Sequence, residues 1–166
     1  MAILRLRVCI HFTVRLGGIS LIMSQLSFRE NAPSVDEYNL LMHSCGWHKH
    51  PEKHVLMALQ RSLYWVSVYD CKSIVGMGRV VGDSKLCFYI QDVVVIPEKQ
   101  KQGIGKTVMD HIMKYLHDNA AQNAYIGLMC RIGVSGFYEQ FGFVSRPNEI
   151  MGPGMVYPNF TPRAIR

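Results

Sequence analysis

The segment 100–107 (QKQGIGKT) restricts the possible folds more than any other part of the sequence. It follows the apolar run 93–96 (VVVI), which is typical of a strand buried on both faces. Behind it, apolar residues recur at helical spacing over 103–119, which predicts an amphipathic helix. A buried strand, a glycine-bearing turn, a helix and the next apolar strand, 124–130, predict a right-handed crossover in an α/β sheet.

The chemistry of this turn favours a ligand that carries phosphate groups. Gly103 and Gly105 let the backbone approach a ligand closely, and the first N–H groups of the helix point at that ligand. Together with the helix dipole, these N–H groups form an anion site. Lys99, Lys101 and Lys106 add positive charge.

Two phosphate-binding patterns compete for the segment. The nucleotide-binding pattern G-x-x-x-x-G-K-[ST] matches at 105–107 but requires a glycine at the position of Gln100. The next apolar strand, 124–130, also lacks the terminal Asp that would hold magnesium. Gln100, Gly103 and Gly105 match the pyrophosphate pattern Q/R-x-x-G-x-G/A in full, so this pattern is preferred.

The preferred pattern resembles the coenzyme A loop of the GNAT acetyltransferase superfamily. Residues 136–143 (GFYEQFGF) resemble the G-F-Y-x-x-x-G-F signature on the last helix of that family, and the resemblance covers roughly 25–157. It implies an α/β (α+β) GNAT fold with a mixed central sheet, a splayed central strand pair and the order β-α-α-β-β-β-α-β-α-β-β. It also implies an acetyl-CoA-dependent N-acetyltransferase, an acyltransferase that acetylates the primary amine of a small molecule by direct attack in a ternary complex.

The pattern of the chain agrees with that order. Ser34 and Glu37 form a capping box, which predicts a helix start. Gly46 ends this helix, and Pro51 suits the first turn of the next one. The predicted strands lie at 25–30, 63–69, 74–82, 85–96, 124–130, 143–145 and 154–157, and the predicted helices at 34–45, 51–62, 103–119 and 133–141.

The resemblance also implies the residues that hold the coenzyme. Main-chain groups of Val93, Val94 and Val95 would pair with the pantetheine arm. Backbone N–H groups of the loop would bind the pyrophosphate, and the loop residues are Gln100, Lys101, Gln102, Gly103, Ile104, Gly105 and Lys106. Many family members place an Asn near the start of the last helix, where Ser135 stands in this chain.

Two side chains are candidates for proton transfer. Tyr138 matches the tyrosine that lies beside the coenzyme A sulfur in the family, where a phenol can protonate the departing thiolate. Asp92 begins the apolar run and is a candidate base, acting directly or through water. A structural or substrate-orienting role for Asp92 and a core role for Tyr138 are the alternatives. A strand N–H near Val94 would meet the developing oxyanion.

The resemblance places the acceptor beneath the first two helices and their loop. Gly46-Trp47, the D-V-V-V strand and the late Gly154-Met155 are similar to plant and cyanobacterial serotonin (arylalkylamine) N-acetyltransferases. Trp47 would then contact the substrate by stacking and cation–π interaction, with a core position as the alternative. The nearby H-x-H-x-x-x-H pattern at 48–54 is not completed by a carboxylate or cysteine, so no metal is expected.

Charge and composition narrow the partners and the domain organisation. Residues 1–22 contain three Arg and no acid, so they supply +3 of the net +6 and leave 6 − 3 = +3 for the rest. This segment is expected to be an extension (an upstream start, a targeting-like segment or an extra strand), with one acetyltransferase domain over 23–166. We expect no nucleic-acid partner and no membrane span, and the five cysteines without a C-x-x-C pair favour the cytoplasm. A homodimer, a protein or peptide acceptor and a non-catalytic coenzyme A-binding module stay open.

Overall fold

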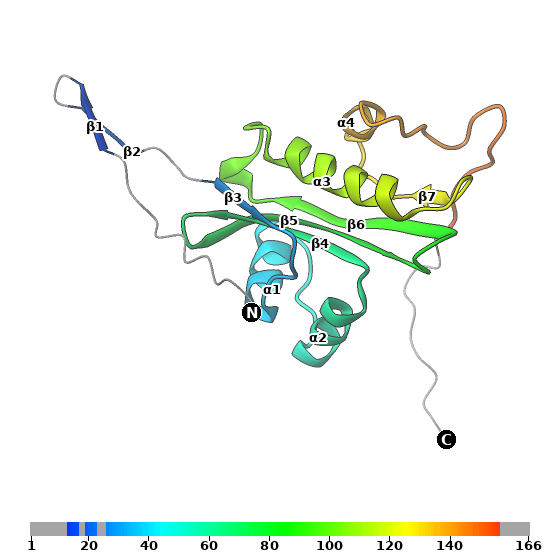
Figure 1. The fold of residues 1–166 in the computed structure, drawn as a ribbon, viewed down its shortest axis with the longest axis horizontal. Coiled ribbons are helices and arrows are strands. Elements are labelled where there is room, and N and C mark those ends of the chain that lie inside the picture. Colours follow the sequence, from blue (N-terminus) through cyan, green and yellow to red (C-terminus); the bar gives the residue numbers. More distant parts are fainter. Residues whose placement is uncertain (1–12, 17–18, 23–25, 157–166) are drawn as a thin grey trace. The chain divides into compact units, whose positions relative to one another are not determined.

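The structure is a computed structural model that describes residues 13–16, 19–22 and 26–156 (Figure 1). The chain divides into two compact units, Met1–Met129 and Cys130–Arg166. Within the predicted extension, β1 (Thr13–Leu16) and β2 (Ile19–Ile22) pair as antiparallel strands. The other positions of 1–22 lie outside the described residues, as do the ends of two predicted strands, Gln25 and Tyr157.

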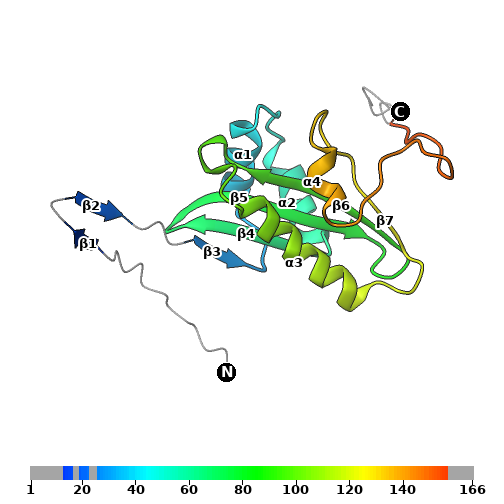
Figure 2. The same cartoon turned by 90° about the horizontal axis from the view of Figure 1, so that it is seen from above.

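The first unit is built on a five-stranded mixed sheet, which confirms the predicted α/β class (Figure 2). The strand order is β3-β4-β5-β6-β7, and all neighbours are antiparallel except β6 and β7, which are parallel. The predicted crossover is therefore present, with one helix between β6 and β7. The strand bounds are β3 (Leu26–Arg29), β4 (Tyr64–Asp70), β5 (Ser73–Gly82), β6 (Cys87–Val95) and β7 (Tyr125–Gly127).

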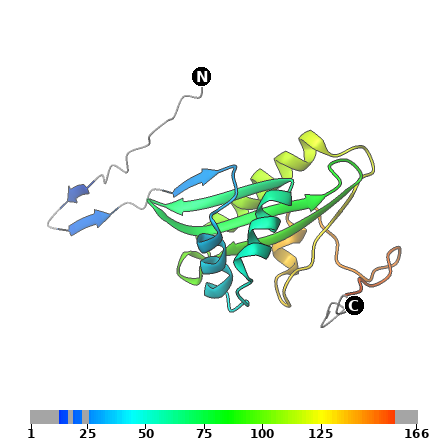
Figure 3. The same ribbon diagram turned by 90° about the horizontal axis from the view of Figure 1, so that it is seen from below.

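Three helices of this unit cover the two faces of the sheet. α1 (Val35–Ser44) and α2 (Glu52–Arg61) lie on one face, and α3 (Ile104–Asn119) lies on the other (Figure 3). The capping box is confirmed, since Ser34 Oγ accepts the Glu37 N–H at 3.2 Å and the Glu37 carboxylate accepts the Ser34 N–H at 2.8 Å. In the part of the chain that the structure describes, no helix is long and apolar enough to cross a membrane.

Separate apolar layers bury the two faces of the sheet. On the α1 and α2 face, the buried residues form one cluster: Tyr38, Leu41, Met42, Val55, Trp65, Tyr69, Ile74, Met77 and Val94. α3 buries one stripe against the other face: Ile104, Val108, Met109, Ile112 and Leu116. This stripe is the apolar face that the helical spacing of the sequence predicts.

α3 rests directly on the backbone of β5 at Gly78. A Cβ added at Gly78 would lie 2.7 Å from Val108 Cγ1 and 2.9 Å from Ile112 Cδ1. Real Cβ atoms do not approach so closely, so glycine is required here for the helix to reach its position. The close contact fixes the height of α3 above the sheet.

The second unit contains one short helix, α4 (Ser135–Glu139). The predicted strands at 143–145 and 154–157 are not found among its described residues, which corrects the predicted end of the fold. Asn148 instead organises turns, because its Oδ1 accepts the N–H groups of Ile150 and Met151 at 3.0 and 2.9 Å. The prolines and glycines of this region also disfavour strands.

Candidate functional site

β6 loses its parallel neighbour after the first three of its nine residues. The ladder with β7 pairs Cys87, Phe88 and Tyr89 with Tyr125–Gly127 and then stops, whereas the pairing with β5 continues to Val95. Beyond Tyr89, the edge of β6 that faces away from β5 therefore has no strand partner among the described residues. Such an edge offers main-chain N–H and C=O groups to an extended ligand, as a strand would.

A β-bulge lies at the start of this open edge. In the ladder between β5 and β6, Met77 pairs with Val94 but Arg79 pairs with Gln91, so two residues of β6 oppose the one residue Gly78. These two residues are Asp92 and Val93, and Asp92 adopts a left-handed φ of +52°. Bulges commonly redirect a side chain, and this one turns Asp92 toward α1.

The main-chain directions differ among the three valines that were expected to hold pantetheine. Ile96 donates its N–H to the Val75 carbonyl of β5 at 2.9 Å, so Ile96 faces β5. Successive residues of a strand face opposite edges, which turns the main chain of Val95 to the open edge and that of Val94 to β5. Val93 belongs to the bulge.

Side chains around the loop hold its own backbone in place. The Val95 carbonyl accepts hydrogen bonds from Gln100 Nε2 at 2.9 Å and from Cys45 Sγ at 3.7 Å, which agrees with its position at the open edge. Gln102 Nε2 donates to the Glu98 carbonyl at 3.2 Å. The first glutamine of the sequence pattern thus joins the loop to the strand.

The loop leads into the N-terminus of α3 without a side-chain cap. Gly103 is the N-cap residue, and its left-handed φ of +81° favours glycine. The helix has no acidic residue in its first turn, and no side chain caps the N–H groups of that turn. An α-helix provides no internal acceptor for the N–H groups of its first turn, here including Ile104 and Gly105. This end of α3 has the properties of an anion site.

The three lysines in and beside the loop 100–106 differ in their ion-pair partners and in their exposure. Lys99 Nζ binds Asp70 Oδ2 at 2.6 Å, which ties the loop to the turn between β4 and β5. Lys106 forms an exposed ion pair with Asp110 at 3.0 Å. Lys101 is exposed and has a left-handed φ of +60°. From the sequence, the three lysines were expected only to add positive charge to the phosphate site. The ion pair with Asp70 shows that Lys99 also fixes the position of the loop.

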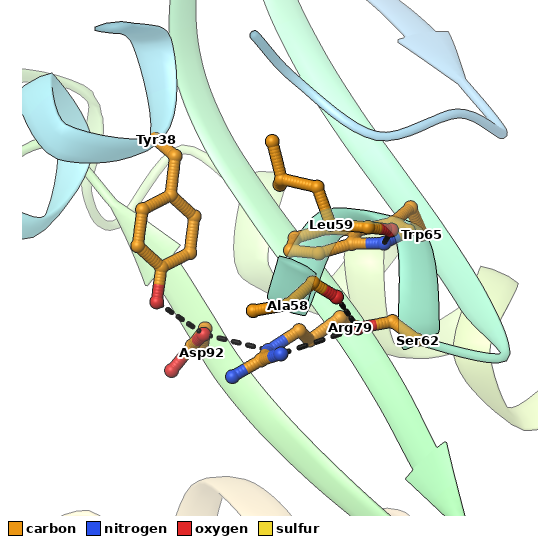
Figure 4. Close-up of polar contacts among 7 residues, drawn as sticks. All are labelled: Tyr38, Ala58, Leu59, Ser62, Trp65, Arg79 and Asp92. Atoms are coloured by element: carbon orange, nitrogen blue, oxygen red, sulfur yellow. Dashed lines mark hydrogen bonds and ion pairs between the residues drawn. The ribbon is translucent and has the colours of Figure 1, made fainter. Parts of the chain in front are cut away.

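Asp92 lies at the centre of a buried polar network (Figure 4). Tyr38 Oη and Arg79 Nε both donate to Asp92 Oδ2, at 2.9 and 2.7 Å. Arg79 Nη1 donates to Ser62 Oγ at 3.1 Å, and Ser62 Oγ donates to the Ala58 carbonyl at 2.8 Å. Burial and the adjacent Asp92 carboxylate raise the pKa of Tyr38, so this phenol stays protonated and donates to Asp92 at neutral pH.

Trp65 packs against two members of this network, Tyr38 and Arg79. Its ring meets Tyr38 edge-on at a centroid distance of 6.3 Å, and the guanidinium carbon of Arg79 lies 5.5 Å from the Trp65 ring centroid. The Trp65 indole N–H donates to the Leu59 carbonyl at 3.2 Å. Sequence reasoning missed Tyr38 and Arg79. The available signal was the single charge of Arg79 within the otherwise uncharged strand 74–82.

Trp47, the residue expected to contact the acceptor amine, lies between the apolar core and the surface. It is partly buried and packs against the apolar cluster of the α1 and α2 face. Its backbone N–H donates to the Met42 carbonyl at 2.9 Å. His48, His50 and His54 are exposed, and within the described ranges no group of three or more His, Cys, Asp or Glu is arranged to hold a metal ion.

In the second unit, Tyr138 lies on α4 among aromatic rings. Its ring meets Phe137 and Phe143 edge-on, at centroid distances of 5.0 and 6.3 Å. Ser135, the other predicted residue of this unit, is the first residue of α4. Burial, with a smaller effect of Cys130, raises the pKa of Tyr138, which keeps the phenol protonated at neutral pH as a proton donor requires.

Known proteins are similar to this chain in sequence and in fold. A family model for the acetyltransferase (GNAT) domain matches residues 47–160. An uncharacterised N-acetyltransferase, ycf52 of Porphyra purpurea, is 32% identical over 75% of this chain and 74% of its own length. GCN5-related N-acetyltransferase 1, chloroplastic, of Arabidopsis thaliana is 33% identical over 72% of this chain and 60% of its own length. A probable acetyltransferase from meticillin-resistant Staphylococcus aureus has a solved structure with a TM-score of 0.73 and 28% identity, and the match covers 80% of this chain and all of that one.

Proposed function

Since the chain belongs to the GNAT acetyltransferase family, we propose that it transfers an acetyl group from acetyl-coenzyme A to a small primary amine in a ternary complex. One observation carries the proposal: beyond Tyr89 the edge of β6 that faces away from β5 has no strand partner among the described residues, and the loop after β6 leads to the N-terminus of α3, which has no side-chain cap. An extended arm that ends in phosphate groups is complementary to both features.

In this proposal the loop and the open edge hold different parts of the co-substrate. Backbone N–H groups of the segment 100–106 bind the pyrophosphate, with Ile104 and Gly105 contributing from the first turn of α3. Main-chain groups of Val93 and the N–H of Val95 pair with the pantetheine arm, since the Val95 carbonyl already accepts Gln100 and Cys45. Val94 contributes its buried side chain to the core. Ser135 takes the position of the Asn that many family members use to contact coenzyme A.

The proposed proton transfers use one carboxyl and one phenol. The attacking amine loses a proton to Asp92, directly or through a water, as its nitrogen forms a bond to the acetyl carbon. Asp92 Oδ2 already accepts two hydrogen bonds, so Oδ1 is the oxygen proposed for this step. An N–H of the bulge beside Val94 stabilises the oxyanion. When the carbon–sulfur bond breaks, Tyr138 protonates the thiolate.

We propose an arylalkylamine as the acceptor. The proposed base Asp92 accepts the hydroxyl of Tyr38, whose ring meets Trp65 edge-on, and aromatic rings suit an amine that carries a flat apolar group. Trp47 packs against the same cluster from the loop after α1, and its proposed contact with the acceptor is part of this hypothesis.

A thiol-release assay with acetyl-coenzyme A and a panel of arylalkylamines, polyamines and peptides tests the proposal. Turnover should be fastest with arylalkylamines. Turnover with peptides alone would replace the small amine by a protein acceptor. Binding of coenzyme A without turnover of any amine in the panel would indicate a non-catalytic binding module.

Location and assembly belong to the same proposal. We propose a cytoplasmic protein, and the Arabidopsis relative, which is named as chloroplastic, makes the chloroplast the alternative to test. A homodimer is the assembly to test. Fractionation of cells tests the location, and measurement of the molar mass in solution tests the homodimer.

A further inference from the structure

The Asp92 network lies at the point where β6 separates from β7. The last pair of the parallel ladder is Tyr89 with Gly127, and the bulge follows three residues later. The bulge residue Asp92 keeps a left-handed backbone, which is uncommon for a residue with a side chain. The surrounding structure must hold it in this conformation, and its side chain contributes two hydrogen bonds to this.

Two donors from different elements supply these contacts. Arg79 comes from β5, the strand opposite the bulge, and Tyr38 comes from α1, 54 residues before Asp92 in the chain. Both donate to the same oxygen, and Figure 4 shows both dashed lines ending on it. Only 5% of the Asp92 side chain and 14% of the Arg79 side chain are exposed, so water screens the ion pair weakly.

The network also reaches the end of α2. The second nitrogen of the Arg79 fork donates to Ser62 Oγ, which in turn donates to the last turn of α2. A planar guanidinium with several donors can hold two partners in a fixed geometry, whereas a lysine ammonium cannot reproduce this fork. α1, the end of α2, β5 and the bulge of β6 are thus fixed relative to one another through one carboxylate and one guanidinium.

We propose that Tyr38 and Arg79 are positioning residues for the acetyl transfer. Resting on the proposed function, this inference gives them a single role, which is to fix the bulge residue Asp92 and with it the direction of Asp92 Oδ1. Neither residue needs to touch the substrate. Their loss should impair the chemical step more than coenzyme binding, because the coenzyme phosphates bind to the separate N-terminus of α3.

The chain offers a matched control for Tyr38. Tyr69 is buried to a similar extent, at 5% exposed against 4% for Tyr38, lies in the same apolar cluster and also donates its hydroxyl to a carboxylate, Glu37 Oε2, at 3.2 Å. It is located on β4, its hydroxyl donates to Glu37, and Arg29 lies over its ring, so it makes no hydrogen bond to Asp92 among those of the described residues. Tyr38→Phe and Tyr69→Phe therefore remove the same atom and the same type of hydrogen bond, and only the first removes a hydrogen bond to Asp92.

The experiment compares both variants with wild type in steady-state kinetics and in coenzyme A binding by calorimetry. We expect Tyr38→Phe to lower kcat at least tenfold and to leave the coenzyme A Kd within about twofold. Tyr69→Phe should leave both within about twofold. Arg79→Met should lower kcat further, and Arg79→Lys should restore part of it. Equal kcat values for the two tyrosine variants would overturn the proposal.

A second measurement does not depend on turnover. Amide hydrogen exchange of residues 90–95 should accelerate in Tyr38→Phe and stay at the wild-type rate in Tyr69→Phe. If wild type acetylates no amine, the proposed function fails, and the exchange difference alone decides the positioning role. Wild-type exchange rates at 90–95 in Tyr38→Phe would reject it.

Discussion

Arg79 pairs in register with Gln91, yet its side chain binds the next residue, Asp92, at 2.7 Å. The bulge explains the offset, because the extra residue of β6 turns Asp92 toward the face on which Arg79 lies. One inserted residue thus creates a buried ion pair three residues beyond the last pair of the ladder with β7. The local register of two strands therefore determines the geometry of the candidate site.

Gly105→Leu should abolish the thermal stabilisation of the protein by coenzyme A. Leucine favours a helix over glycine by about 0.5–1 kcal/mol, so the ligand-free helix should not suffer from the change. The added side chain would cover N–H groups that are proposed to bind the pyrophosphate. Thermal midpoints with and without coenzyme A measure the effect, and circular dichroism of the ligand-free variant controls for folding. A stabilisation equal to that of wild type would contradict the assignment of the loop.

Tyr138→Phe should lower kcat by about 10²-fold or more and leave coenzyme A affinity largely unchanged. The variant keeps the ring that packs edge-on against Phe137 and Phe143 and loses only the hydroxyl. Steady-state kinetics and calorimetry separate the two effects. Tyr125→Phe, which alters an exposed tyrosine of β7, is the matched control and should behave as wild type. Unchanged turnover in Tyr138→Phe would remove this residue from the mechanism.

Gly78→Ala should destabilise the protein by about 1–3 kcal/mol, the usual cost of overpacking a core. The new methyl group would meet Val108 Cγ1 at 2.7 Å and push α3 away from the sheet. Val108→Ala removes that contact, so the double variant should be less destabilised than the sum of the single variants. Denaturant unfolding of all four proteins measures the coupling. Strict additivity would show that the helix does not rest on Gly78.

Asp83→Asn should lower the stability of the protein at neutral pH, and the difference in stability from wild type should become smaller at acidic pH. Asp83 Oδ1 accepts the N–H groups of Cys87, Lys85 and Leu86 at 2.8–3.0 Å, and these bonds lower its pKa below the unfolded value of 3.8. A depressed folded pKa contributes stability above the unfolded pKa, and this stability is lost as the pH falls through the folded pKa. Thermal midpoints of both proteins from neutral pH to about pH 3 should therefore converge. A constant difference would argue against this role of the charge.

Local patterns predicted the parts of the fold that depend on neighbours in sequence. The capping box of Ser34 and Glu37, the start of α3 after Gly103 and the buried stripe of α3 each follow from residues a few positions apart. The resemblance supplied the splayed pair, and the structure shows it as the short ladder between β6 and β7. These features needed no knowledge of tertiary contacts.

The buried network could not be predicted in the same way. Tyr38 and Asp92 are 54 residues apart, and their contact depends on the side of the sheet that α1 covers and on a bulge that shifts the register. The strand predicted at 143–145 failed for a related reason. An apolar run forms a strand only where a neighbour accepts it, and the following segment is held in turns by Asn148 instead.

The open edge of β6 beyond Tyr89 also has a consequence for the behaviour of the protein in solution. Bare strand edges are templates on which segments of other chains can add, and most proteins shield them with charges, short strands or covering loops. A small molecule that lies along β6 would serve as such a shield. The bound metabolite would then protect the polypeptide against self-association, and depletion of that metabolite would leave the edge bare.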